Sequence, residues 1–475
     1  MIYKKIDVFN GVIWSAIDKF SIVAVTLIFE ILIARLLSPN DYGIIGMISV
    51  FVVLGQVFID GGFSVALIQK TDRTESDFST AFYFNLFLAI VVYIVIFVSS
   101  PLISNFYDID LTLYIRLISI NIILNSLVIV HRAKLSILLD FKTQAKFSFL
   151  AVLISGLFGF GLAYSGYGIW ALIVQSISLS FFTTIFFWIK MRWLPEKNFS
   201  RESFNSLFSF GSNLLLSSVI QAVYQNLYSI VIGKSFSSKE LGLYTKSTQF
   251  SLMPITMMTN VLQRVSLPYF SSFKNDLVQL YKLYLKYTKI ICIIFFPGVI
   301  GFMILAKNFV LIFLSNSWSE TIPILQILLI TFIFYPIIVI NMTILQVRAK
   351  TKIFLIIEIS TKVLGLTILF ITFTYGFMYL IIGLFIQQFL QLIITSVLIN
   401  RLCFNNNFSQ IKIVLPILFF CVFLNAISYL ILQLLEDSYI LQGLVGVGLI
   451  FINYSIVAFF YMKNDLHNII KGKFL

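Results

Sequence analysis

Long apolar stretches follow one another along almost the whole chain, and short polar segments separate them. A helix needs about 20 mostly apolar residues to cross the hydrocarbon core of a membrane, so each stretch predicts one spanning helix. We expect fourteen spans, at 11–34, 42–68, 79–104, 111–131, 147–164, 169–189, 207–233, 245–266, 288–313, 322–346, 353–373, 377–399, 413–434 and 440–462. The pattern therefore predicts an all-α polytopic membrane protein.

The composition excludes the soluble classes of protein. Of the 475 residues, 59% are hydrophobic and 11% are charged, whereas soluble domains average about 45–50% apolar and about 25% charged residues. The three cysteines, Cys292, Cys403 and Cys421, form no CxxC pair, which gives no reason to expect a metal site or redox chemistry.

The basic residues alternate between the two sides of the predicted membrane domain. Of the 33 Lys and Arg residues, 25 lie in the connections of one side, 5 lie in those of the other, and 3 lie within spans. Basic loops remain in the cytoplasm, so we expect both termini to be cytoplasmic. The same asymmetry explains the net charge of +13 without a nucleic-acid partner, because these loops face the membrane lipids of an anionic leaflet.

One segment of the chain occurs twice. Ile33–Ile44 (IARLLSPNDYGI) matches Ile232–Leu243 (IGKSFSSKELGL) at a shift of 199 residues. Both copies read as helix starts in which a serine, Ser38 or Ser237, is followed three residues later by the acid of a capping box. The shared glycines, Gly43 and Gly242, would allow a neighbouring backbone to approach closely.

A second, shorter match supports an organisation in two halves. Residues 166–172 (GYGIWAL) resemble residues 374–380 (TYGFMYL) at a shift of 208 residues. We expect an N-terminal six-helix lobe at 1–190, a cytoplasmic linker at 191–204 and a C-terminal six-helix lobe at 205–400. Residues 401–475 would add two transmembrane helices and a cytoplasmic tail.

These residues resemble a known family. Ala34–Gly43 (ARLLSPNDYG), Asp60–Lys70 (DGGFSVALIQK) and Thr80–Asn85 (TAFYFN) are similar to segments of bacterial polysaccharide flippases of the O-antigen and colanic-acid type. Those proteins belong to the multidrug/oligosaccharidyl-lipid/polysaccharide exporter superfamily. Shorter similarities extend the resemblance over residues 10 to 345, among them Leu139–Lys142, Tyr167–Gln175, Leu241–Tyr244 and Trp318.

The resemblance implies a flippase in the bacterial inner membrane. Its substrate would be an undecaprenyl-diphosphate-linked oligosaccharide, carried by alternating access through a cavity between two lobes in a V-shaped arrangement. A polysaccharide polymerase and a chain-length regulator are the protein partners that the family implies. No cofactor is expected, apart from coupling to a proton or sodium gradient or to the membrane potential. Where the family often carries an acid shortly after Asn226, this chain has Tyr228.

Cations within the spans are the first candidates for the substrate site, because a diphosphate is anionic and a charge inside a membrane normally faces the protein interior. They are Lys19, Arg116 and Lys362. Each has a structural alternative: Lys19 could pair with an acid of a neighbouring helix, and Arg116 could reach the membrane interface. Lys362 lies four residues after Glu358, a spacing at which the two side chains neutralise each other.

Polar groups within the spans are the second set. Gln56, Gln225 and Asn226 could bind sugar hydroxyls, although hydrogen bonds between helices would explain them equally well. The carboxylates Glu30, Asp60 and Glu358 are candidates for ion coupling. Residues 270–289 read as an amphipathic helix at the membrane interface.

Two other functions fit the sequence less well. A multidrug or cation exporter of the same superfamily would be expected to use buried acids, whereas the deepest ionisable groups here include two lysines. A membrane polysaccharide polymerase or ligase would be expected to carry a large outer loop. The chain has short outer connections and no HExxH, GxSxG or P-loop motif, so we do not expect an enzyme.

Overall fold

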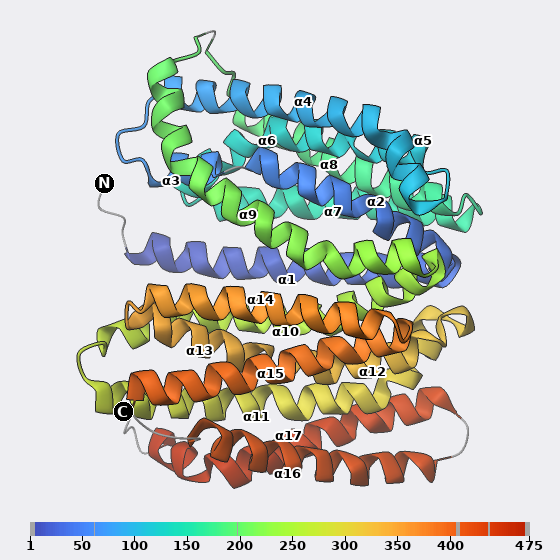
Figure 1. The fold of residues 1–475 in the computed structure, drawn as a ribbon, viewed down its shortest axis with the longest axis vertical. Coiled ribbons are helices and arrows are strands. Elements are labelled where there is room, and N and C mark those ends of the chain that lie inside the picture. The colour runs from blue at the N-terminus through green and yellow to red at the C-terminus, as the bar shows by residue number, and fades with distance from the viewer. Residues whose placement is uncertain (1–4, 61, 197, 405–408, 436–437, 471–475) are drawn as a thin grey trace. The chain divides into compact units, whose positions relative to one another are not determined.

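A computed structural model describes residues 5–60, 62–196, 198–404, 409–435 and 438–470. For some of these residues it describes only the backbone, namely 5–20, 60, 210, 213–214, 261, 264–265, 351 and 462–470. The described residues are almost entirely helical (Figure 1). In chain order the helices are α1 Lys5–Leu36, α2 Pro39–Asp60, α3 Phe63–Gln69, α4 Glu75–Tyr107, α5 Thr112–Ile118, α6 Ile120–Ile137, α7 Phe141–Tyr164, α8 Ile169–Met191, α9 Arg201–Ser235, α10 Ser238–Ser272, α11 Leu277–Phe309, α12 Thr321–Phe332, α13 Tyr335–Val347, α14 Thr351–Phe373, α15 Phe377–Phe404, α16 Ser409–Gln433 and α17 Tyr439–Ile470.

The fourteen predicted spans all correspond to helices. By length and hydropathy, twelve helical stretches of the described residues can cross a membrane, and they coincide with twelve of the predicted spans. Helices α1 and α10, which are 32 and 35 residues long, occupy the places of the other two. Three spans are built from two consecutive helices, α2 with α3, α5 with α6, and α12 with α13. The prediction of an all-α multi-pass membrane protein is therefore confirmed.

The predicted amphipathic helix at 270–289 is not a separate element. Helix α10 ends at Ser272, and Asp276 then caps α11 by accepting a hydrogen bond from the backbone N–H of Gln279 at 3.0 Å. From Leu277 the segment continues without a break into the span, and Leu280 and Tyr284 are fully buried. The prediction of a separate helix was wrong, because residues 277–289 form the first turns of α11 and their buried side chains pack within unit 2.

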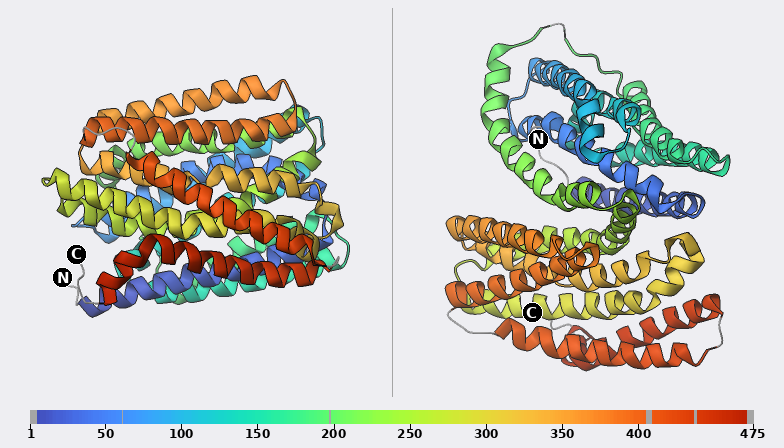
Figure 2. Two further views of the ribbon diagram at one scale, coloured as in Figure 1. Left: turned by 90° about the horizontal axis from the view of Figure 1, so that it is seen from below. Right: turned by 45° about the vertical axis from the view of Figure 1, so that its right-hand side comes forward.

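Two compact units divide the chain, Met1–Gly242 and Leu243–Leu475. In unit 1, α7 packs between α1 and α8, α6 packs against α4 and α8, and α9 lies along α2 (Figure 2). In unit 2, α11 packs against α16 and α17, while α15 packs against α12, α13 and α14. Helix α10 starts in unit 1 and continues into unit 2.

The units do not end where the predicted lobes do. Helix α9, which opens the predicted second lobe, packs on α2, α3 and α4 within unit 1. The lobes at 1–190 and 205–400 describe a repeat in the sequence, and this division stays a prediction.

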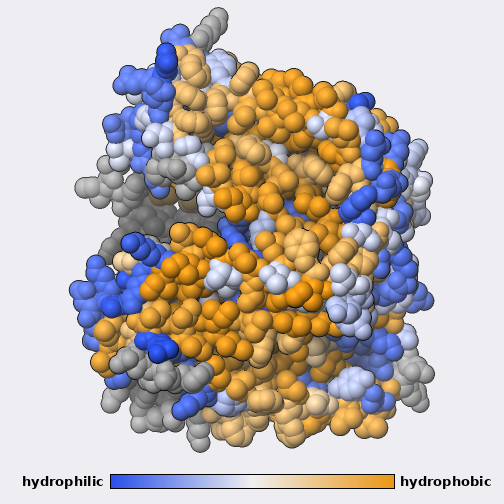
Figure 3. Space-filling model, viewed as in Figure 1, coloured by the Kyte–Doolittle hydropathy of each residue, from blue (hydrophilic) through white to orange (hydrophobic). Residues whose placement is uncertain are grey.

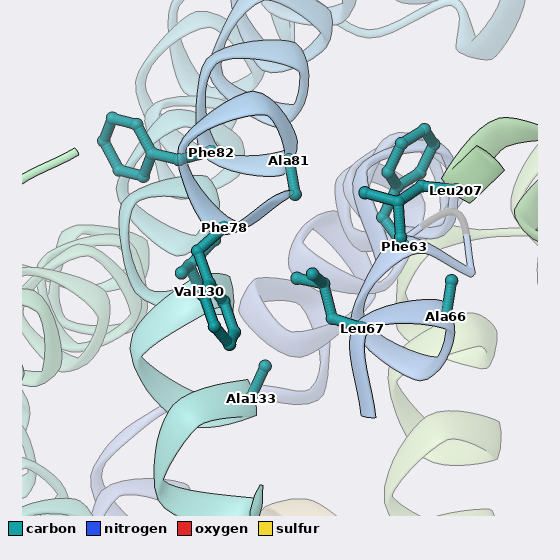
Figure 4. Close-up of a cluster of buried hydrophobic side chains, with 9 residues drawn as sticks. All are labelled: Phe63, Ala66, Leu67, Phe78, Ala81, Phe82, Val130, Ala133 and Leu207. Atoms are coloured by element: carbon teal, nitrogen blue, oxygen red, sulfur yellow. The ribbon is translucent and has the colours of Figure 1, made fainter. Parts of the chain in front are cut away.

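The segment predicted as a linker, 191–204, is held against the start of α4 where the structure describes it. The indole N–H of Trp193 donates to Glu75 at 2.8 Å, and the backbone N–H groups of Glu196 and Ser200 donate to the hydroxyls of Ser79 (2.8 Å) and Thr80 (3.0 Å). Trp193 and Phe204 also pack against an apolar cluster of α3, α4, α6 and α9 (Figure 4). It comprises Phe63, Ala66, Leu67, Phe78, Ala81, Phe82, Val130, Ala133 and Leu207. These contacts fix where α9 begins.

The surface has the pattern expected of a protein in a bilayer. In each unit, apolar residues cover the middle of the helices and polar residues gather at their two ends (Figure 3). Large apolar side chains are exposed on the flanks, for example Leu102 at 71% and Phe451 at 69%. Exposed apolar area of this extent marks a surface that contacts lipid or another protein, and the length and hydropathy of these helices favour lipid.

Candidate functional site

The two copies of the repeated segment lie against each other in unit 1. In the first copy, the Ser38 hydroxyl and backbone N–H donate to one oxygen of Asp41 at 2.6 and 3.0 Å. In the second, the Ser237 hydroxyl and backbone N–H both donate to one oxygen of Glu240 at 2.9 Å. Both predicted capping boxes are therefore confirmed, and they fix the first turns of α2 and α10 at this contact.

Glycine makes the contact possible. A Cβ atom on Gly43 would lie 1.6 Å from the carbonyl oxygen of Ser238, and a Cβ atom on Gly242 would lie 1.8 Å from that of Pro39. At the shift of 199 residues Gly43 corresponds to Gly242 and Pro39 to Ser238, so the contact is reciprocal. The Ser238 hydroxyl also donates to the side-chain oxygen of Asn40. We call the residues 38–43 and 237–242 the glycine crossing.

An ion pair lies on the chain next to the glycine crossing. Lys234, near the end of α9, pairs with Asp108 after α4 at 2.7 Å. Gly233, the residue before Lys234, leaves room for the side chain of Tyr107, because a Cβ atom on Gly233 would lie 3.0 Å from the Tyr107 ring. The C-terminal ends of α4 and α9 are thus held together beside the start of α10.

Gly242→Leu should lower the free energy of unfolding by about 1–3 kcal/mol, the usual cost of overpacking, because its side chain would enter the Pro39 carbonyl. The measurement is thermal unfolding of the purified protein in detergent. Gly161→Leu in α7 is the matched control, since a Cβ atom there meets no atom within 4 Å. An equal loss in both variants would contradict the close approach at the glycine crossing.

The predicted substrate cations have these places. Lys19 lies in α1, among the residues of which only the backbone is described. Arg116 is half-buried in α5, donates to the hydroxyl of Ser100 at 3.0 Å and stacks on Phe97 at 4.2 Å. Lys362 pairs with Glu358 at 3.3 Å on α14, as their spacing predicted. Arg116 and Lys362 therefore have partners within their own units.

The polar candidates divide in the same way. Gln56 accepts a hydrogen bond from the Asn125 amide at 3.2 Å, which joins α2 to α6. Asn226 donates to the carbonyl of Ala222 in its own helix at 2.8 Å, whereas Gln225 is exposed. These hydrogen bonds of Gln56 and Asn226 hold helices of unit 1 together or close a turn within one helix.

The carboxylates predicted for ion coupling lie apart along the chain. Glu30 is half-buried in α1, and Glu358 has Lys362 as its partner on α14. Asp60 ends α2, and its side chain lies outside the described residues. Their roles stay predictions.

Replacing either Glu358 or Lys362 alone by Leu should lower the amount of protein in the membrane several-fold, because it removes the ion-pair partner of a charge within a span. Replacing both should restore most of that amount. Quantitative immunoblots of membrane fractions would measure this. A double variant as poorly tolerated as the singles would contradict mutual neutralisation and favour a separate role for Lys362.

Sequence reasoning missed a buried polar network in unit 2. Asn341 on α13 accepts hydrogen bonds from the Tyr284 hydroxyl (3.0 Å) and the Gln410 amide (2.8 Å), and its own amide donates to Gln410 at 3.1 Å. Thr288, Thr395 and Ser396 complete the set. We call these six residues the Asn341 network. They come from α11, α13, α15 and α16, and no signal in the sequence pairs them.

It also missed a buried cation. The third turn of α10 carries Lys246, which is only 1% exposed and whose ammonium lies 3.1 Å from the Gln249 side-chain oxygen. The residue 199 positions earlier is Met47, which is buried as well. The sequence placed Lys246 in an outer connection, and comparison of the repeats could have flagged it as a charge where its counterpart is apolar.

Comparisons with known proteins agree with this fold. A family model described as "Polysaccharide biosynthesis protein" matches residues 32–323. The Teichuronic acid biosynthesis protein TuaB of Bacillus subtilis (strain 168) is 25% identical over 330 residues, covering 68% of this chain and 68% of the relative. The Lipopolysaccharide biosynthesis protein WzxC of Escherichia coli (strain K12) is 26% identical over 330 residues, covering 67% and 65%.

Solved structures extend the likeness to the whole chain. One described as "Lipid II flippase MurJ, inward closed conformation" has a TM-score of 0.77 at 16% identity, covering 96% of this chain and 100% of that one. An inward-facing multidrug resistance MATE family transporter of the MOP superfamily has a TM-score of 0.60 at 15% identity, covering 80% and 96%. At these identities the likeness establishes the fold.

Proposed function

The chain belongs to the polysaccharide biosynthesis protein family, and on that basis we propose that it is a flippase that moves undecaprenyl-diphosphate-linked oligosaccharide repeat units across the cytoplasmic membrane. Such units serve the synthesis of O-antigen, capsule or exopolysaccharide. Two relatives carry names that fit this class, a teichuronic acid and a lipopolysaccharide biosynthesis protein. The alignments span about two thirds of each relative's length, so the substrate is part of the proposal.

The glycine crossing is the structural observation that best supports a transport cycle. Two repeats must pack closely at one end when a cavity is open at the other, and must separate when the cavity reverses. The crossing joins equivalent residues of the two repeats through backbone contacts and a side-chain hydrogen bond from Ser238 to Asn40. A contact of this kind is close enough to exclude water and small enough to be broken in every cycle.

The predicted site residues differ in whether they must give up a present partner before they can bind substrate. Lys19 remains our first candidate for the diphosphate. Arg116 and Lys362 would have to exchange Ser100 and Glu358 for substrate before they could bind it. Gln56, Gln225 and Asn226 are proposed contacts for sugar hydroxyls, and Glu30, Asp60 and Glu358 are proposed for coupling to protons or sodium.

The distribution of basic residues supports an orientation. We place both termini in the cytoplasm and the glycine crossing at the outer face of the inner membrane, because the connections with 25 of the 33 basic residues lie at the opposite ends of the spans. A polysaccharide polymerase and a chain-length regulator would act at the outer face on the product.

The experiment that tests this function uses a strain deleted for the gene. We expect complete repeat units on undecaprenyl diphosphate to accumulate in the cytoplasmic leaflet, and the wild-type chain to rescue transport. Failure of Lys19→Ala to rescue at equal expression would support the cationic site, whereas full rescue would remove Lys19 from it. Repeat units that reach the outer leaflet but are not polymerised would contradict a flippase and favour a polymerase or ligase.

The exporter alternative requires its own measurement. Loss of the chain would then lower resistance to cationic drugs and leave the leaflet of the lipid-linked units unchanged. The deletion strain distinguishes the two functions without any variant.

A further inference from the structure

The charges at one end of unit 2 are almost all positive. This end comprises the connections α10–α11, α13–α14 and α15–α16, the side that the distribution of Lys and Arg assigns to the cytoplasm. Its described residues include one acid, Asp276, and nine cations: Lys274, Lys282, Lys286, Lys289, Arg348, Lys350, Lys352, Arg401 and Lys412. We call these nine residues the basic end of unit 2.

The same end of unit 1 is different. Its acids are interleaved with the bases, and two of them form close ion pairs, Lys70 with Asp77 at 2.8 Å and Lys134 with Glu75 at 2.7 Å. In unit 2 the carboxylate of Asp276 is the N-cap of α11. Among the described residues, the excess of cations over acids is therefore larger at this end of unit 2 than at the same end of unit 1.

Two contacts hold the connections of the basic end together. The Arg348 guanidinium donates to the carbonyl of Lys274 at 3.1 Å, and the Lys350 ammonium donates to the carbonyl of Leu402. Both acceptors are neutral carbonyl groups; Lys274 follows α10, and Leu402 lies in the last turn of α15. These bonds fix the positions of the cations without cancelling their charge.

Two of the exposed lysines head stripes of exposed apolar residues. On α14, Lys352 lies three, four and seven residues before Leu355, Ile356 and Ile359, which are 53–64% exposed. On α16, Lys412 precedes Leu415, Phe419 and Phe423 on one helix face, and these are 41–66% exposed.

Helix α11 adds two more exposed cations. Lys282 and Lys286 are exposed one turn apart, whereas Leu283 and Tyr284 between them are buried. At about 1.5 Å per residue, a helix of 33 residues is longer than a hydrocarbon core about 30 Å thick, so these first turns extend into the headgroup layer.

From this arrangement we propose that the basic end of unit 2 binds anionic phospholipids of the cytoplasmic leaflet. A lysine above an apolar stripe presents its ammonium at headgroup level while the stripe contacts the acyl chains. Basic residues close to a membrane surface attract anionic lipids, and the attraction grows with each added cation. An acidic protein would satisfy the charges but not the apolar residues directly below them, which is why a lipid is the better partner.

The test compares two triple variants of the full chain in nanodiscs of equal phosphatidylglycerol and phosphatidylcholine. Lys282→Gln/Lys352→Gln/Lys412→Gln removes three charges from the basic end, and Lys146→Gln/Lys190→Gln/Arg201→Gln removes three exposed charges from unit 1. Native mass spectrometry counts the phosphatidylglycerol retained. We expect retention to fall at least about tenfold in the first variant and far less in the second.

Salt provides a second measurement that needs no variant. Retention of phosphatidylglycerol by the wild-type chain should fall as NaCl rises from low to molar concentration, because screening shortens the range of the charges. Equal losses in the two triple variants, or equal retention of phosphatidylglycerol and phosphatidylcholine, would overturn the proposal and leave an acidic protein as the partner of this surface. The result does not depend on transport, so the proposed function can fail independently.

Discussion

Oxidation of a variant that carries Asn40→Cys and Ser238→Cys is expected to stop transport in proportion to the cross-linked fraction, and reduction is expected to restore it. The two side chains are in hydrogen-bond contact, so a disulfide or a short thiol cross-linker can join them. The bond would hold the glycine crossing closed. A cycle that must open this end cannot then be completed.

The chain is well suited to this experiment. Its own cysteines, Cys292, Cys403 and Cys421, are all buried, so an added pair reacts selectively. The readout is the leaflet of the lipid-linked units in the deletion strain, with and without oxidant. Each single cysteine variant is the control for the substitution itself. Continued transport by fully cross-linked protein would show that the glycine crossing stays closed throughout the cycle.

Asn341→Leu is expected to cause the largest loss of stability among single substitutions in unit 2. It leaves the Tyr284 hydroxyl and the Gln410 amide without their partner, and an unsatisfied buried polar group costs about 1–3 kcal/mol. We expect a loss of about 3 kcal/mol, which corresponds to a fall of about 6–12 °C in the unfolding midpoint for a unit of this size.

Two comparisons distinguish the loss of the network's hydrogen bonds from the general effect of replacing an asparagine by leucine. Asn226→Leu removes an amide whose bond is to its own helix, so it should cost less than about 1 kcal/mol. The double variant Asn341→Leu/Gln410→Leu should lose less than the sum of its single variants, because the two amides bond each other. Purely additive losses would show that the amides are not coupled.

The sequence was sufficient for the features that depend on local pattern. Apolar length predicted every span, although not the breaks that divide three of them into two helices. The spacing of Ser38 from Asp41 and of Glu358 from Lys362 predicted bonds that the structure contains. The glycines of the repeat also indicated a close backbone approach, although not that the two copies approach each other.

Features that depend on distant residues could not be read in the same way. Trp193 meets Glu75 across 118 residues, and Asn341 meets Gln410 across 69. An apolar helix face looks the same in the sequence whether it meets lipid or protein, which is why the start of α11 was misread. A substrate site is subject to the same limit, because its cations must be brought together from different helices.

The Asn341 network has a consequence for the order in which unit 2 matures. Synthesis proceeds from the N-terminus, so α11, α13 and α15 enter the membrane before the residue that completes their hydrogen bonds, Gln410 on α16, has been made. Until then Asn341 and Thr288 lie in an apolar interior with part of their bonding capacity unused. Insertion of α16 is therefore the step that completes the hydrogen bonds of the preceding helices. A nascent chain released before residue 410 would expose unsatisfied polar groups to the quality-control machinery of the cell.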